Sequence, residues 1–355
     1  MTRPDQTRPD QTRPDQTTHV RKSSLELLRV VAMLMIVAHH FSVHGGFSFS
    51  ADTITLNRLW TQFLFMGGSL GNDIFVLISG YFLVNSSGIN YHKLFKLWLK
   101  IFFYSVVFYG VFVFAGLEVF SLKTMLKIMM PVTKNAIGLW FVSAYFVMYM
   151  IHPYINVMIK AMSREDCTKF VKALVIYWCI IPMLTKSSFG ANNTINFICL
   201  YCIAAYIRLY APDFRGRRHI GLGVLCILLN FLSVIVLDIV SVRIRMNSIY
   251  FIGMMRPVTI MACVCLLGGF SGLDIPHSKV VNLLASATFG VYMIHDNRFV
   301  RPFLWRTLFN NASFQDSSYL IPYSIAVILV VYISCTVIEL IRAKIFRILS
   351  GGRLS

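Results

Sequence analysis

Charged side chains are scarce in this sequence. Asp, Glu, Lys and Arg together make up 14% of its 355 residues, whereas soluble domains devote about a quarter of their residues to these four types. Acidic residues are the scarcer half, with 15 of them against 33 basic ones. This deficit excludes an ordinary soluble protein of this length.

Long apolar runs take the place of the missing charge. Hydrophobic residues make up 57% of the chain, and its mean hydropathy is +0.67. Many runs reach about 20 residues, the length that crosses the hydrocarbon core of a bilayer. The sequence therefore predicts an all-α polytopic integral membrane protein with about ten transmembrane helices, at roughly 25–44, 59–84, 97–117, 138–159, 171–185, 194–210, 219–240, 249–272, 283–297 and 319–341.

The basic surplus follows the predicted loops. Taken alone, the formal net charge of +18 suggests nucleic-acid binding. However, about 21 of the Lys and Arg residues fall on the side of the membrane that holds both termini, and about 10 fall on the other. By the positive-inside rule both termini are cytoplasmic, and we expect membrane lipids rather than nucleic acid around the protein. Lys123, Lys127 and Lys134 lie on the less basic side and fit this topology poorly.

The composition divides the chain into three segments. Residues 1–22 hold three copies of Thr-Arg-Pro-Asp-Gln, whose regular prolines exclude a helix, so we expect a disordered cytoplasmic tail. Residues 23–345 form the predicted transmembrane domain, and residues 346–355 form a basic cytoplasmic tail. No inverted repeat typical of a transporter is evident, and we expect no appended soluble domain.

Metal-binding motifs are also scarce. Most of the eight cysteines lie in apolar runs, where a thiol behaves as a small hydrophobic side chain. Cys199 and Cys202 form one C-x-x-C without the second pair of a zinc site. We therefore expect no metal cofactor.

The first predicted span carries two ionisable residues in an otherwise apolar run, Arg29 and His40. Eleven helical steps of about 100° return a side chain to within roughly 20° of its starting direction. The two residues therefore share one helix face, about 16 Å apart along the axis. Because ionisable groups in a span are costly and usually functional, the pair indicates a catalytic or a transport site, and the catalytic interpretation assigns a role to each residue. Arg29 binds an anion and is oriented by Glu26, and His40 transfers a proton.

Each of these assignments has a plainer alternative. Arg29 could reach the lipid headgroups or simply pair with Glu26, and His40 could be a hydrogen-bonded core residue. His39 is rotated about 80° from Arg29 on the helix, so we assign it a packing role. His44, one turn beyond His40, is placed to orient an acceptor.

Two later spans carry further candidates. Asp73, Ser79 and Tyr81 lie in the second span, where a helix-start acid and a small-residue packing notch are the alternative explanation. His295 closes the ninth span, followed by Asp296. These last two residues either form a polar cluster at the outer mouth of the bundle or cap a helix in water.

Arg256 and Trp140 complete the supporting set. Arg256 is a mid-span cation that needs a partner such as Asp73, Glu339 or a ligand. Trp140 either supports the site or belongs to the aromatic belt at the membrane interface.

Taken together, these residues resemble the membrane-bound acyltransferase family 3. Arg29 followed by ten residues and His40 is similar to the Arg-x10-His signature of that family. The resemblance covers residues 23–345. Three further blocks occur in the family's order: Asp73 to Phe82, Leu139 to Phe141 and Phe289 to His295.

The resemblance implies transfer of an acyl group, most often acetyl from acetyl-CoA, to a hydroxyl of a cell-envelope polysaccharide or its lipid-linked precursor. It also implies a bacterial plasma membrane protein whose co-substrate is acyl-CoA and whose acceptor is a glycan. Arg29 would bind the phosphates or the arm of CoA, aided by the inner-face residue Arg208 and by Arg256. His40 would act as general base or carry the acyl group transiently.

Two other classes of function compete with this interpretation. A glycolipid or acyl-donor transporter would use Arg29, His40 and Arg256 as relay charges, although acidic residues are scarce within the spans. A catalytically silent scaffold of a glycan-export complex would tolerate the loss of Arg29 and His40.

Overall fold

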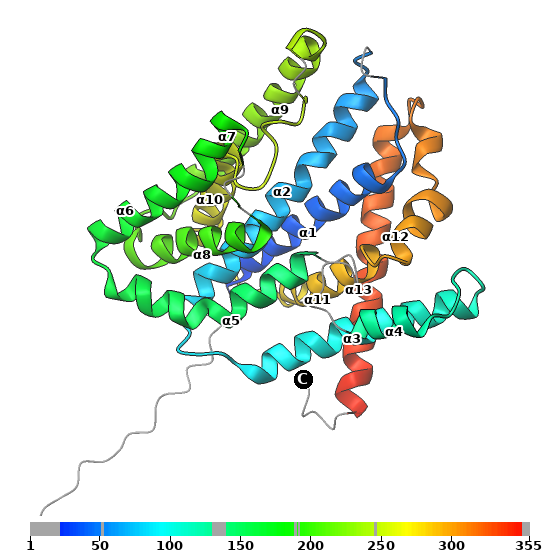
Figure 1. The fold of residues 1–355 in the computed structure, drawn as a ribbon, viewed down its shortest axis with the longest axis horizontal. Helices are drawn as coiled ribbons and strands as arrows, with labels where there is room; N and C mark the ends of the chain where they lie inside the picture. The colour runs from blue at the N-terminus through cyan, green and yellow to red at the C-terminus, as the bar shows by residue number, and fades with distance from the viewer. Residues whose placement is uncertain are drawn as a thin grey trace, which may run out of the picture.

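The computed structural model describes residues 22–50, 53–129, 140–187, 190, 192–244 and 247–349, and every regular element in these ranges is helical (Figure 1). The repeats in residues 1–21, Lys134 and residues 350–355 lie outside the described residues. The long helices are α1 (Ser23–His44), α2 (Leu56–Leu83), α3 (Tyr91–Phe114), α5 (Trp140–Ala161), α8 (Asn193–Tyr210), α9 (Arg218–Ile244), α10 (Pro257–Ser271), α11 (Lys279–His295) and α13 (Leu320–Leu349).

Shorter helices connect or extend these elements. They are α4 (Leu122–Met129), α6 (Arg164–Val175), α7 (Ile181–Thr185), α12 (Val300–Pro302) and the distorted turns η1 (Ile176–Ile180), η2 (Phe303–Leu308) and η3 (Asn311–Phe314). The wider turns of η1 join α6 and α7 into one continuous helical run. Lys123 and Lys127 lie on α4, which packs against α3.

Seven helical segments of the described chain are long and apolar enough to cross a membrane by length and composition. The prediction of an all-helical, multi-pass membrane protein is therefore confirmed for these ranges. Each of the ten predicted spans overlaps a helix or helical run. The number of crossings and the cytoplasmic placement of the termini stay predictions. The last helix continues to Leu349, beyond the predicted end of its span.

Helix α1 lies in the middle of the bundle, where α2, α10, α11 and α13 pack against it (Figure 1). Its apolar side chains on several faces are fully buried, among them Leu25, Leu28, Val37 and Phe41. A helix that is apolar around most of its circumference suits such a central position. The polar residues of α1 are therefore held inside protein.

The contact between α1 and α2 is close because α2 presents glycines to it. A Cβ atom at Gly67 would lie 2.2 Å from the Met35 carbonyl oxygen, and one at Gly68 would lie 2.5 Å from the His39 ring. Only residues without a side chain permit this approach, as at other helix contacts in membranes.

Helices α1 and α11 run parallel and are aligned at both ends. The backbone N–H of Ser278, just before α11, donates to the Ser23 hydroxyl at the start of α1, at 3.0 Å. The same number of residues separates Ser23 from His40 as separates Ser278 from His295. Equal rise along two parallel helices therefore brings the two histidines to one level.

The predicted mid-span position of Arg256 is wrong. The helix in this part of the chain begins only at Pro257, and Arg256 precedes it in an extended conformation. Proline is favoured at the first helical position and disfavours a helical conformation in the preceding residue. Arg256 therefore lies at a helix end, where its guanidinium carbon stands 4.8 Å from the ring centre of Tyr250.

The close packing of Gly67 against α1 predicts an effect on the stability of the protein. Gly67→Ala should lower the thermal unfolding temperature of the detergent-solubilised protein, because the new methyl group collides with the α1 backbone at a cost of about 1–3 kcal/mol. Gly110→Ala is the matched control, because no atom lies within 4 Å of its new methyl group. A Gly67→Ala protein as stable as the Gly110→Ala protein would contradict the close packing.

Candidate active site

His40 and His295 form a buried pair between α1 and α11. The Nδ1 atom of His40 lies 2.8 Å from Nε2 of His295, and the ring centres are 5.0 Å apart. His295 is fully buried and His40 is 9% exposed. The parallel alignment of the two helices thus joins residues that are 255 positions apart in the sequence.

The hydrogen bonds of this pair fix which nitrogen atoms carry protons. Nδ1 of His295 lies 2.6 Å from the Val291 carbonyl oxygen, which can only accept, so Nδ1 of His295 is the donor. In a neutral His295 the Nε2 atom is then an acceptor, and Nδ1 of His40 donates to it. A neutral His40 therefore has an unprotonated Nε2 atom, which is the atom that a general base requires.

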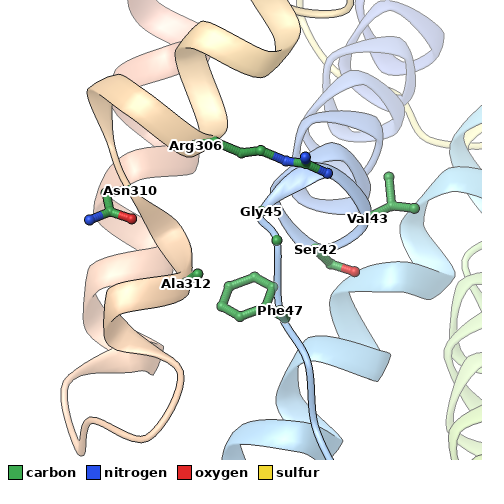
Figure 2. A pocket seen from close by; sticks show the side chains of 8 residues that line it. Ser42, Val43, Gly45, Phe47, Arg306, Asn310 and Ala312 are labelled. Carbon is green, nitrogen blue, oxygen red and sulfur yellow. The ribbon is translucent and has the colours of Figure 1, made fainter.

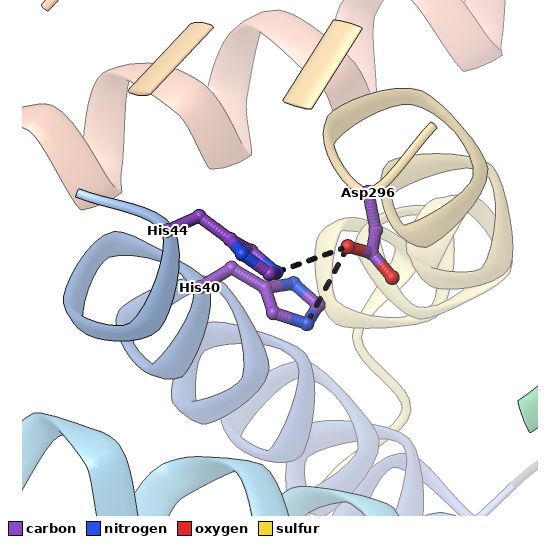
Figure 3. A group of neighbouring side chains, drawn as sticks. All are labelled: His40, His44 and Asp296. Carbon is purple, nitrogen blue, oxygen red and sulfur yellow. Dashed lines mark ion pairs between the residues drawn. The ribbon is translucent and has the colours of Figure 1, made fainter. Parts of the chain in front are cut away.

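Asp296 lies opposite that free nitrogen atom (Figure 3). Its Oδ1 atom stands 3.6 Å from Nε2 of His40 and 3.7 Å from Nε2 of His44. Arg301 Nε is 2.7 Å from the same oxygen, and its Nη2 atom donates to the Asp296 carbonyl at 3.0 Å. A carboxylate held in this way is placed to stabilise positive charge that develops on either imidazole.

The same three residues have the composition of a metal site. His40, His44 and Asp296 each offer one ligand atom, and these atoms lie within 4.8 Å of one another. However, the Arg301 guanidinium stands beside the carboxylate oxygen that would bind the ion, and its positive charge opposes a divalent cation there. The expectation of a metal-free site stays a prediction.

His39 faces away from this cluster, toward α2. Its Nδ1 atom lies 2.7 Å from the Phe65 carbonyl oxygen, and its ring packs over Gly68. The structure thus places His39 at the helix contact and His40 in the polar cluster.

The other end of α1 carries Arg29 and Glu26. The Arg29 guanidinium donates to the Glu26 carboxylate one turn back on the helix, so the predicted pairing of these two side chains is present. The Glu26 side chain is 8% exposed and that of Arg29 is 24% exposed. Arg29 is therefore both oriented by a carboxylate and partly accessible.

Two further arginines gather at Tyr81, near the end of α2. Arg208 donates to the Tyr81 hydroxyl at 2.9 Å, and its guanidinium carbon lies 4.7 Å from the ring centre. The Arg215 guanidinium carbon lies 6.0 Å from the same ring. Arg208 was predicted from the sequence, whereas Arg215 was not singled out.

No hydrogen bond or ion pair among the described residues joins Asp73, Ser79 or Trp140 directly to the His40–His295 pair or to Arg29. Asp73 is fully buried, and its carboxylate oxygens have no hydrogen-bond partner among the described residues. The Ser79 hydroxyl donates to the Phe75 carbonyl of its own helix at 2.8 Å. Trp140 packs edge-on against Phe197, with ring centres 6.1 Å apart.

Glu339 is not a partner of Arg256. Its carboxylate accepts hydrogen bonds from Tyr104 at 2.6 Å and from Arg342 at 2.8 Å, and it pairs with Lys100 at 2.7 Å. These contacts join α3 to α13. The buried carboxylate is thereby satisfied within the bundle, as burial of a charge requires.

Arg301, beside the histidine cluster, is a second residue that sequence reasoning missed, after Arg215. It follows α11 by six residues and lies in α12, a short helix that no hydrophobic period marks. Its only sequence signal is its position as a cation soon after the His295-Asp296 pair. Asp296 itself was predicted as part of a polar cluster, and its position beside His40 and His44 gives that cluster its geometry.

The fold and the site define a multi-pass helical membrane protein with a buried histidine pair near one end of its central helix and an arginine–glutamate pair near the other. The family model described as an acyltransferase domain, acyltransferase family 3, matches residues 22–339. The chain therefore belongs to this family and is a membrane acyltransferase. No curated protein and no solved structure matches it.

The prediction of a metal-free site can be tested by measuring the rate of acyl transfer. Treatment with EDTA followed by its removal should leave the transfer rate unchanged, and His44→Ala should retain activity to within about tenfold of wild type. His40→Ala should lose about 10²–10⁴-fold, the usual contribution of a general base. Loss of activity on chelation that Zn²⁺ restores, with His44→Ala as inactive as His40→Ala, would instead establish a metal centre.

Proposed function

We propose that the protein transfers an acetyl or other acyl group from acyl-CoA, at the Arg29 end of the bundle, to a hydroxyl of a cell-envelope glycan at the His40 end. The donor enters from the cytoplasm and the acceptor is a capsular or exopolysaccharide or its lipid-linked precursor, in a bacterial plasma membrane. Family membership supports the acyl transfer, and the residues at the two ends of α1 support its direction.

One observation carries the proposal, the hydrogen bond from His40 Nδ1 to His295 Nε2. Because this bond occupies the Nδ1 proton, the opposite nitrogen of a neutral His40 has a free lone pair. That nitrogen lies on the same helix face as Arg29, about 16 Å away along α1. A base at one end and a cation at the other match the thioester and the phosphates of CoA.

The chemistry that follows is a direct acyl transfer. Nε2 of His40 takes the proton of the acceptor hydroxyl while that oxygen attacks the thioester carbonyl. The C–S bond then breaks, a C–O ester bond remains, and the proton passes from His40 to the CoA thiolate. Asp296, 3.6 Å from Nε2, stabilises the imidazolium that forms between these two steps.

The donor end contains several groups that suit CoA. Arg29 is fixed by Glu26, and Arg208 and Arg215 lie around the Tyr81 ring. Guanidinium groups bind phosphate oxygens through two donors at once. We leave Arg256 out of this donor-binding group. It precedes the first residue of α10, whereas the opposite end of that helix contacts the Arg215–Gly216 segment.

The main test is covalent transfer of radiolabelled acetyl from acetyl-CoA to envelope glycan in membranes that contain the protein. His40→Ala should abolish this labelling without lowering protein abundance. His39→Ala is the matched control, because His39 contacts α2, and it should retain most of the activity.

Several outcomes would contradict the proposal. Loss of labelling in His39→Ala but not in His40→Ala would move the base to the neighbouring residue. Full labelling in both variants would remove histidine from the chemistry. Movement of glycolipid across the membrane without covalent labelling would favour a transporter.

A further inference from the structure

A cavity lies just beyond the last turn of α1, outside the histidine cluster. Its volume is about 520 Å³, and it opens between the end of α1 and the segment that contains η2 and η3 (Figure 2). We refer to it as the exit pocket. The lining residues that carry the argument are Ser42, Gly46, Phe47, Arg306, Asn310 and Ala312.

The backbone at the end of α1 keeps the exit pocket open. Gly46 has a φ of +80°, which favours glycine, and a Cβ atom there would stand 3.8 Å from Cβ of Ala312 and 3.9 Å from Nε of Arg306. A methyl group at Gly46 would therefore make ordinary van der Waals contact with Ala312 and Arg306 across the pocket. Gly46 and Ala312 both line the exit pocket, and neither has a side chain large enough to occupy its volume.

The lining has one charged group and no carboxylate. Arg306 extends from η2 across the pocket toward the end of α1 (Figure 2), and its Nε donates to the His44 carbonyl at 3.4 Å. None of the described carboxylates forms an ion pair with Arg306, and the Asp296 carboxylate pairs with Arg301 instead. The guanidinium is exposed and positioned by one backbone contact.

The remaining lining groups suit a sugar. The Asn310 amide and the Ser42 hydroxyl can both donate and accept hydrogen bonds, and the Phe47 ring offers an apolar face for the C–H side of a pyranose. A few polar groups beside an aromatic surface are typical of small-molecule sites. An arginine adds a preference for a carboxylate or a phosphate, which it binds through two parallel donors.

We propose that the exit pocket binds an acidic sugar residue of the acceptor glycan, with its carboxylate or phosphate on Arg306 and its ring on Phe47. This inference rests on the proposed function, since it names the class of acceptor. Two contacts also place the exit pocket beside the candidate active site. Arg306 bonds to the carbonyl of His44, and the His44 ring lies 3.7 Å from Asp296. The exit pocket therefore borders the cluster that contains His40, and a glycan bound in it would lie beside that cluster.

The test measures binding by the full-length protein in detergent, without acyl-CoA. The probes are tetrasaccharides that contain glucuronic acid, galacturonic acid or a sugar phosphate, each compared with a neutral tetrasaccharide of the same length by calorimetry. We expect at least one acidic probe to bind about tenfold or more tightly than its neutral counterpart, the effect of one good charge-assisted contact. Equal affinity across all pairs would overturn the proposal.

Variants test whether the preference for acidic over neutral probes arises in the exit pocket. Arg306→Gln should remove it, and Arg306→Lys should retain part of it, because a point charge remains without the second donor. Arg298→Gln is the matched control, because this exposed arginine lies over the Phe299 ring and outside the pocket. Ala312→Phe, which fills the pocket without changing charge, should weaken binding of every probe. An undiminished preference in both Arg306→Gln and Ala312→Phe would overturn the assignment.

A lipid headgroup is the rival source of the anionic group. Glycerol 1-phosphate should compete poorly with the preferred acidic tetrasaccharide. Competition by glycerol 1-phosphate at equal concentration would assign the pocket to lipid and overturn the glycan proposal.

Failure of this inference and failure of the proposed function are distinguishable. If acidic probes bind through Arg306 but no acetyl reaches glycan, the pocket assignment holds and the transfer proposal fails. If acetyl transfer proceeds and Arg306→Gln leaves the KM for an acidic acceptor unchanged, the pocket assignment fails and the transfer proposal holds.

Discussion

The hydrogen bond between the imidazoles of His40 and His295 is the interaction on which the rest of the site depends. It forms because α1 and α11 are parallel and aligned from Ser23 and Ser278 onward. It sets the tautomer of His40, and thereby decides which nitrogen faces Asp296. Without this bond the ring of His40 could turn, and its Nε2 atom would no longer be held opposite Asp296.

The central helix α1 carries ionisable groups at two levels inside the apolar bundle. A charged group inside a span is costly unless it is paired, and both levels meet that requirement, with Glu26 beside Arg29 and Asp296 beside His40. Between the two levels α1 is lined by buried apolar residues. A flexible donor with phosphates at one end and a thioester at the other fits that separation better than a compact substrate does.

Helical periodicity was sufficient to predict part of this arrangement. The shared face of Arg29 and His40 and the rotation of His39 away from that face follow from the spacing of residues in one helix, and local geometry of this kind can be predicted from sequence. The partnership of His40 with Asp296 and Arg301 depends on how two helices align and how the chain turns after α11. Such tertiary relations leave no periodic signal.

The central claim is that the two ends of α1 have separate tasks, donor binding and chemistry. The most direct measurement compares the steady-state kinetics of Arg29→Gln and His295→Gln with acyl-CoA as the varied substrate. The account predicts that Arg29→Gln raises the KM for acyl-CoA and leaves kcat largely intact, whereas His295→Gln lowers kcat at an unchanged KM. An unchanged KM in Arg29→Gln, or a raised KM with normal kcat in His295→Gln, would contradict it.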